Sequence, residues 1–75
     1  MTKIDLLKMI DQLGADYCPK CIISIKRNSH MNDLKGDEDI NQDLVDAIIV
    51  DFINYIGVYQ GVDYAMYTKD LYKNR

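Results

Sequence analysis

The sequence predicts an all-α domain, a small bundle of three to four short helices packed around a central helix at residues 40–56. Apolar residues recur through that segment at steps of three and four, which stack side chains on one face of a helix. A similar spacing occurs in residues 4–13 and again in residues 62–73. The chain has 75 residues, so we expect one domain spanning residues 1–75.

The first helix is predicted over about residues 2–13. Thr2 and Asp5 have the spacing of a capping box, in which each residue binds a free N–H group at the start of the helix. Gly14 suits the left-handed position that often ends a helix. Between them lies a broad apolar stripe of Ile4, Leu6, Leu7, Met9, Ile10 and Leu13.

Residues 17–34 fit two interpretations. Pro19 is well placed in the first turn of a helix, and Cys21, Ile22 and Ile25 would then lie on one side. The run 21–25 is also β-branched and of strand length. We favour the helix, with an α+β fold that pairs about 21–26 with 62–68 as the alternative. Residues 28–36 are predicted to form a polar connection, which His30, Met31 and Leu34 could make partly helical.

The central helix is expected to be buried on more than one side, because its apolar residues cover about half of its circumference. Asp39 is the predicted N-cap, with Gln42 three residues later. Gly57 is predicted to end the helix, and Gly61 marks a second break before a last helix at residues 62–73. The apolar residues are Ile40, Leu44, Val45, Ile48, Ile49, Phe52, Ile53 and Ile56.

The net charge of −3 conceals a strong segregation along the chain. Residues 28–63 contain only Lys35 against eight acids, whereas residues 1–27 and 64–75 each have an excess of two positive charges. An acidic segment of this kind repels phosphate and attracts basic surfaces, which makes direct binding of nucleic acid unfavourable. The candidate partner-binding acids are Asp33, Asp37, Glu38, Asp39, Asp43, Asp46 and Asp51.

Tyrosines crowd the last 21 residues, while tryptophan is absent. Tyrosine covers apolar area and tolerates water, so it is common in interfaces, although it also packs on the half-buried faces of small domains. A chain this short has little interior for so many rings, and we expect a homodimer to cover some of the apolar surface. The candidate interface tyrosines are Tyr55, Tyr59, Tyr64 and Tyr67.

Cys18-Pro19-Lys20-Cys21 is the one motif-like element. Two thiolates at this spacing can hold one side of a tetrahedral zinc ion, with His30 as a third ligand and Asp16, Asp33 or a second chain as a fourth. A redox-active thiol pair is another interpretation. The favoured one is that both cysteines simply pack as small apolar side chains. The two cysteines are expected to be free thiols or metal ligands rather than a structural disulfide, since we expect a reducing compartment.

Catalysis is not expected, because the chain lacks a nucleophile elbow, a phosphate-binding glycine loop and a paired-acid site. No apolar run is long enough to cross a membrane, and the N-terminal pattern differs from a signal peptide, so a cytoplasmic protein without a membrane partner is expected. The leading hypothesis is a small acidic interaction module that docks on a basic, nucleic-acid-binding surface of another protein, in the manner of a phage-type inhibitor or DNA mimic. The alternative is a zinc-stabilised dimerisation module that uses Cys18 and Cys21. No other cofactor is expected.

Overall fold

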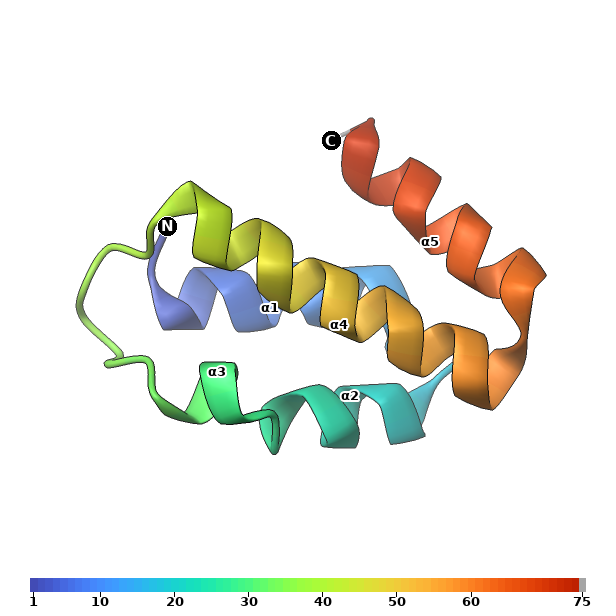
Figure 1. Cartoon of the computed structure of the whole chain (residues 1–75), viewed down its shortest axis with the longest axis horizontal. Coiled ribbons are helices and arrows are strands. Elements are labelled where there is room, and N and C mark those ends of the chain that lie inside the picture. The colour runs from blue at the N-terminus through green and yellow to red at the C-terminus, as the bar shows by residue number, and fades with distance from the viewer. Residues whose placement is uncertain (75) are drawn as a thin grey trace.

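The computed structural model describes residues 1–74, which form five helices and the segments that connect them (Figure 1). The helices are α1 (Lys3–Gly14), α2 (Pro19–Lys26), α3 (Ser29–Asn32), α4 (Gln42–Gln60) and α5 (Val62–Lys73). No strand occurs within these residues, so the all-α prediction is confirmed. The bundle has one helix more than the three to four expected, and the extra one, α3, is a single turn of four residues.

The alternative α+β fold, with residues 21–26 paired to 62–68, is wrong, because both segments are helical. In α2 the buried residues Cys21, Ile22 and Ile25 follow a helical spacing, and Ile23 between them is 52% exposed. A strand would instead have buried every second residue. Burial of this face therefore outweighs the β propensity of the isoleucines.

The long helix α4 lies at the centre of the bundle and packs against α1, α2 and α5. Its predicted burial on more than one side is confirmed. The core around it comes mainly from α1 and α2, whereas α5 contributes a single fully buried residue, Thr68. The buried residues of α4 are Val45, Ile48, Ile49, Phe52 and Ile56.

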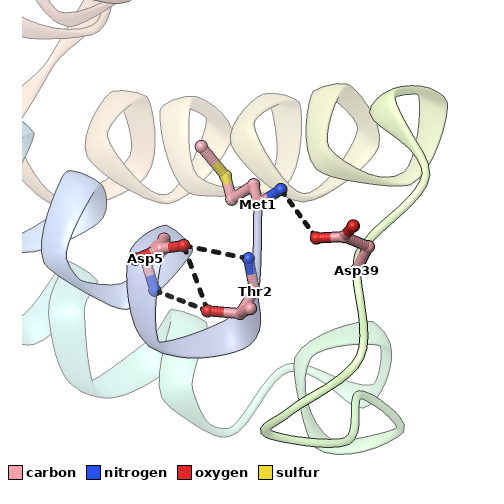
Figure 2. A network of polar contacts seen from close by, with 4 residues as sticks. All are labelled: Met1, Thr2, Asp5 and Asp39. Carbon is pink, nitrogen blue, oxygen red and sulfur yellow. Dashed lines mark hydrogen bonds and ion pairs between the residues drawn. The ribbon is translucent and has the colours of Figure 1, made fainter.

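The prediction that Asp39 caps α4 is wrong. Asn41 is the N-cap, and its side-chain oxygen accepts a hydrogen bond from the N–H of Asp43 at 2.8 Å. Asp39 instead forms an ion pair with the N-terminal ammonium of Met1 at 3.2 Å (Figure 2). The N–H of Ile40 also donates to the carbonyl oxygen of Met1, at 2.8 Å. The start of the chain thus holds the end of the loop that leads into α4.

The predicted capping box of α1 is confirmed (Figure 2). The Thr2 N–H and hydroxyl both donate to Asp5 Oδ2, at 3.2 and 3.1 Å, and the Asp5 N–H donates to Thr2 Oγ1 at 3.4 Å. The hydrogen bond from the Thr2 backbone, followed by that from its hydroxyl, lowers the pKa of the Asp5 carboxyl below its ordinary value. The charged form of Asp5 is therefore the one that the helix start favours.

Two of the three glycine predictions are wrong. Gly57 lies inside α4 rather than at its end, whereas the predicted break at Gly61 is confirmed, since Gly61, with φ of 102°, separates α4 from α5. That conformation strains any residue with a Cβ, which explains the position of the break. Gly14 is the last residue of α1 and is not left-handed. A Cβ at Gly14 would lie 2.6 Å from Phe52 Cζ, so its missing side chain lets α1 approach α4 closely.

Candidate protein-interaction surface

Six carboxylates lie on the loop before α4 and on the first turns of that helix, and all six side chains are exposed. The loop follows α3 and carries most of them, because its polar residues cannot pack in the core. We call this group the acidic segment. It consists of Asp33, Asp37, Glu38, Asp39, Asp43 and Asp46.

Cations of the chain compensate little of this charge. Within residues 1–74, the ion pairs of the acidic segment are those of Asp39 with the N-terminal ammonium at 3.2 Å and of Glu38 with Lys35 at 3.8 Å. Both are exposed, and pairs of that kind contribute about 0–1 kcal/mol. Lys26, Arg27 and Lys69 pair with none of these acids. The negative field of the acidic segment therefore extends into solvent.

Two of the seven predicted acids accept hydrogen bonds from neutral side chains. Asp51 is half-buried and accepts a hydrogen bond from Asn28 Nδ2 at 3.2 Å, and the same amide donates to the Tyr55 hydroxyl at 3.0 Å. Asp46 accepts from Gln42 Nε2 at 3.0 Å and from the Tyr72 hydroxyl at 2.8 Å. Asp51 and Tyr55 thus join α4 to Asn28, the N-cap of α3, which gives them a structural role.

The remaining candidate tyrosines lie on the hairpin formed by α4 and α5. Tyr59, Tyr64 and Tyr67 are 48%, 46% and 55% exposed. Eight of the eleven exposed large apolar side chains of residues 1–74 belong to residues 50–71. This concentration is typical of an interaction surface. The eight are Val50, Val58, Tyr59, Val62, Tyr64, Met66, Tyr67 and Leu71.

Tyr17, which the sequence analysis did not select, joins this surface from the turn after α1. Its ring stacks on Tyr64 with centroids 5.2 Å apart and planes inclined by 26°, and it lies 6.4 Å from the Tyr67 ring. The Tyr17 hydroxyl donates to the Leu13 carbonyl at 2.8 Å and is hydrogen-bonded to the hydroxyl of Thr68. No local pattern identifies this contact, because Tyr17 and Thr68 are 51 residues apart.

A shallow depression lies on α5 beside the stacked rings. Its walls are Asp63, Tyr64 and Tyr67, and most of the lining is apolar. Because the Tyr17 hydroxyl gives its proton to Leu13, the single proton of the Thr68 hydroxyl is shared between the Tyr17 oxygen and the Tyr64 carbonyl oxygen, which is 2.8 Å away. Thr68 and Tyr17 thus fix the base of the aromatic cluster. The depression thus combines rigid aromatic walls with one carboxylate.

The predicted metal ligands do not come together. Cys18 and Cys21 are joined in a disulfide and fully buried, whereas His30 is exposed on α3. No group of three metal-binding side chains occurs in residues 1–74. The expectation of two free thiols is wrong in this structure, since the first turn of α2 holds the two Cα atoms 5.2 Å apart, within disulfide range. Zinc binding requires thiolates, so that hypothesis applies only to the reduced protein.

Comparison of the chain with protein-family models, with curated proteins and with solved structures finds no match. None of the helices in residues 1–74 has the length and apolar character needed to cross a membrane.

Proposed function

We propose that this protein is a non-catalytic interaction module whose acidic segment docks on a basic surface of another protein. One observation carries the proposal: six exposed carboxylates gather on one loop and the adjoining turns of α4, and within residues 1–74 only Asp39 and Glu38 form ion pairs, both at the surface. Their charge is thus available to a partner. Steering by such a field raises the rate of association and favours partners of opposite charge.

A basic surface that evolved to bind phosphate is the natural target. Arginine and lysine side chains that bind phosphate oxygens also form charge-assisted hydrogen bonds with carboxylates. A protein that places carboxylates in such a groove competes with nucleic acid for it. The proposed activity is therefore inhibition or regulation of a nucleic-acid-binding protein by occupation of its binding surface.

The acidic segment alone does not supply enough contact area for a stable interface. A stable interface buries about 800 Å² on each partner, and the whole molecule exposes 4859 Å². Such an interface would cover about one sixth of the surface, which is more than one loop provides. Tyr59, Tyr64 and Tyr67 lie at the end of α4 and on the first half of α5, away from the acidic segment at the start of α4 (Figure 1). Tyrosines are common at the buried centre of interfaces, so these exposed rings would add contact area on a partner that spans the length of the bundle.

Cytoplasmic location and formation of a homodimer belong to the same proposal. A disulfide is unusual in a reducing compartment. Cys18 and Cys21 are completely buried, and thiol exchange requires access to a sulfur atom. Burial would therefore protect this disulfide from cytoplasmic thiols, which makes it compatible with a cytoplasmic location.

Two variants of equal net charge test the proposal. Asp33→Asn, Asp37→Asn and Glu38→Gln together neutralise three exposed acids of the acidic segment. The matched control, Asp11→Asn, Asp16→Asn and Asp70→Asn, neutralises three exposed acids elsewhere. Each variant should be used with the native protein as bait in affinity capture from the native host, followed by mass spectrometry.

We expect the native protein and the control to retain the same basic partner, and the first variant to lose it. Retention of that partner by both variants would show that the acidic segment does not bind it. Loss from both would show that net charge, rather than this segment, determines binding. Circular dichroism of both variants checks that the helices are intact.

A further inference from the structure

We propose that Asp63, Tyr64 and Tyr67 on α5 form a binding site for a guanidinium group, supplied by an arginine side chain on the surface of the basic partner. The identity of the partner rests on the proposed function, but the site itself is independent of the acidic segment. These three residues line the depression described above, whose walls are mainly apolar.

The aromatic walls suit a flat cation. Guanidinium is planar and weakly hydrated, and it stacks on aromatic faces, whereas the ammonium group of lysine is strongly hydrated. Contact between a cation and a tyrosine ring contributes about 0.5–1 kcal/mol at exposed sites. Tyr64 and Tyr67 are three residues apart on α5, so their side chains lie on the same side of the helix.

The position of Tyr64 is fixed before any ligand arrives. One side of its ring is stacked on Tyr17, whose hydroxyl is held by the Leu13 carbonyl and by Thr68. The residue is nevertheless 46% exposed and lines the depression, whereas Tyr17 does not. The side of Tyr64 away from Tyr17 is therefore open to a ligand. A wall that is already ordered lowers the entropy cost of binding.

Asp63 provides the charge that selects a cation. Its side chain is exposed and has no hydrogen-bond or ion-pair partner within residues 1–74. Asp63 is in the first turn of α5, where the helix dipole is positive and would by itself repel a cation. The carboxylate reverses that local field. Without it, only the cation–ring contact would favour a cation over an uncharged side chain.

Three tripeptides test the site directly: acetyl-Gly-Arg-Gly-amide, the same peptide with citrulline, an uncharged isostere of arginine, in place of arginine, and the same peptide with leucine there. NMR titration should follow the ring protons of Tyr64 and Tyr67. We expect the arginine peptide to shift both rings and the citrulline peptide to bind about threefold more weakly or worse, because it lacks both the cation–ring contact and the ion pair. Equal binding of the arginine and citrulline peptides, or tighter binding of the leucine peptide, would overturn the proposal.

Single substitutions test whether the arginine peptide binds at this depression. Tyr67→Leu and Asp63→Asn should each weaken binding of the arginine peptide by about two- to fivefold. The control Tyr59→Leu replaces a ring that is 48% exposed but lies outside the depression, and it should leave binding unchanged. Unchanged binding in both Tyr67→Leu and Asp63→Asn would overturn the proposal. All three substituted residues are exposed, and circular dichroism checks that each variant is folded.

The tripeptides also separate this proposal from the proposed function. Combined Asp33→Asn, Asp37→Asn and Glu38→Gln should not affect binding of the arginine peptide, since those residues lie outside the depression. If the arginine peptide binds as expected but that variant still retains the partner, the proposed role of the acidic segment is wrong, whereas the proposed arginine site is supported. If the peptide does not bind while the variant loses the partner, the arginine site is wrong and the proposed function stands.

Discussion

Gly14 and Phe52 approach so closely that a methyl group on Gly14 would lie 2.6 Å from the ring carbon Cζ of Phe52. Phe52 is fully buried, so its ring cannot move into solvent. We predict that Gly14→Ala destabilises the protein by about 1 kcal/mol or more. Overpacking a core costs about 1–3 kcal/mol, which exceeds the gain of about 0.5–1 kcal/mol from replacing glycine in a helix. Chemical denaturation measures the difference.

Gly57→Ala is the matched control, and its effect should have the opposite sign. Gly57 lies within α4, and a Cβ there would be 3.7 Å from the Cβ of Ala65, an ordinary contact. The better helix propensity of alanine should then stabilise the protein by about 0.5–1 kcal/mol. Destabilisation by Gly57→Ala, or stabilisation by Gly14→Ala, would contradict the packing described here.

The hydrogen bond between the hydroxyls of Tyr17 and Thr68 should give a measurable interaction energy in a double-mutant cycle of unfolding free energies. Thr68 is the one fully buried polar side chain of residues 1–74. We predict that Tyr17→Phe and Thr68→Val each cost about 1 kcal/mol, because each removes a largely buried hydrogen bond. In the double mutant the combined loss should be smaller than the sum of the two. Strict additivity would indicate that the two hydroxyls do not interact.

The capping box predicts a pH dependence of stability. Hydrogen bonds from Thr2 lower the pKa of Asp5 in the folded state, so the stabilisation is complete above the pKa that Asp5 has in the unfolded chain. It is lost as the pH falls through the lower, folded-state pKa. The native protein should therefore exceed Asp5→Asn in stability near neutral pH, and the gap should shrink in acid. Denaturation over a pH series measures this gap, and a constant gap would contradict the assignment.

Sedimentation measures the predicted homodimer. Val58, Val62 and Met66 are 80%, 68% and 61% exposed and lie on either side of the turn at Gly61. We expect the mass to rise towards that of a dimer with increasing concentration, and Met66→Lys to shift the equilibrium towards the monomer. Ile4→Lys, which changes a 57% exposed residue on α1, is the control. A monomer mass at every concentration would exclude the dimer.

Local signals predicted the elements well. The start of α1 was visible in Thr2 and Asp5, since both partners of a capping box lie within four residues. The last helix was predicted at 62–73 and spans Val62–Lys73. In α2 the proline at the first helical position and the helical spacing of Cys21, Ile22 and Ile25 favoured the correct structure.

The predictions were wrong where contacts between residues distant in the sequence determine the structure. Asp39 is a good capping residue by type, but the N-terminal ammonium binds it, and Asn41 takes the cap. Gly57 has the character of a helix end, yet the helix continues because nothing at that position requires a left-handed residue. The predicted surface missed Tyr17, whose partners Tyr64 and Thr68 lie in the last helix. Only the folded chain brings these residues together.

The most direct test of the acidic segment is the salt dependence of binding to the captured partner. Exposed charges separated by more than about 10 Å are screened at 0.1 M salt, so attraction between a carboxylate surface and a basic groove weakens as salt is added. We predict that the dissociation constant, measured by calorimetry, rises steeply from low to high ionic strength. The Asp33→Asn, Asp37→Asn, Glu38→Gln variant should show a shallower slope. An affinity that is the same at both ionic strengths would contradict the proposal that these carboxylates bind a basic surface.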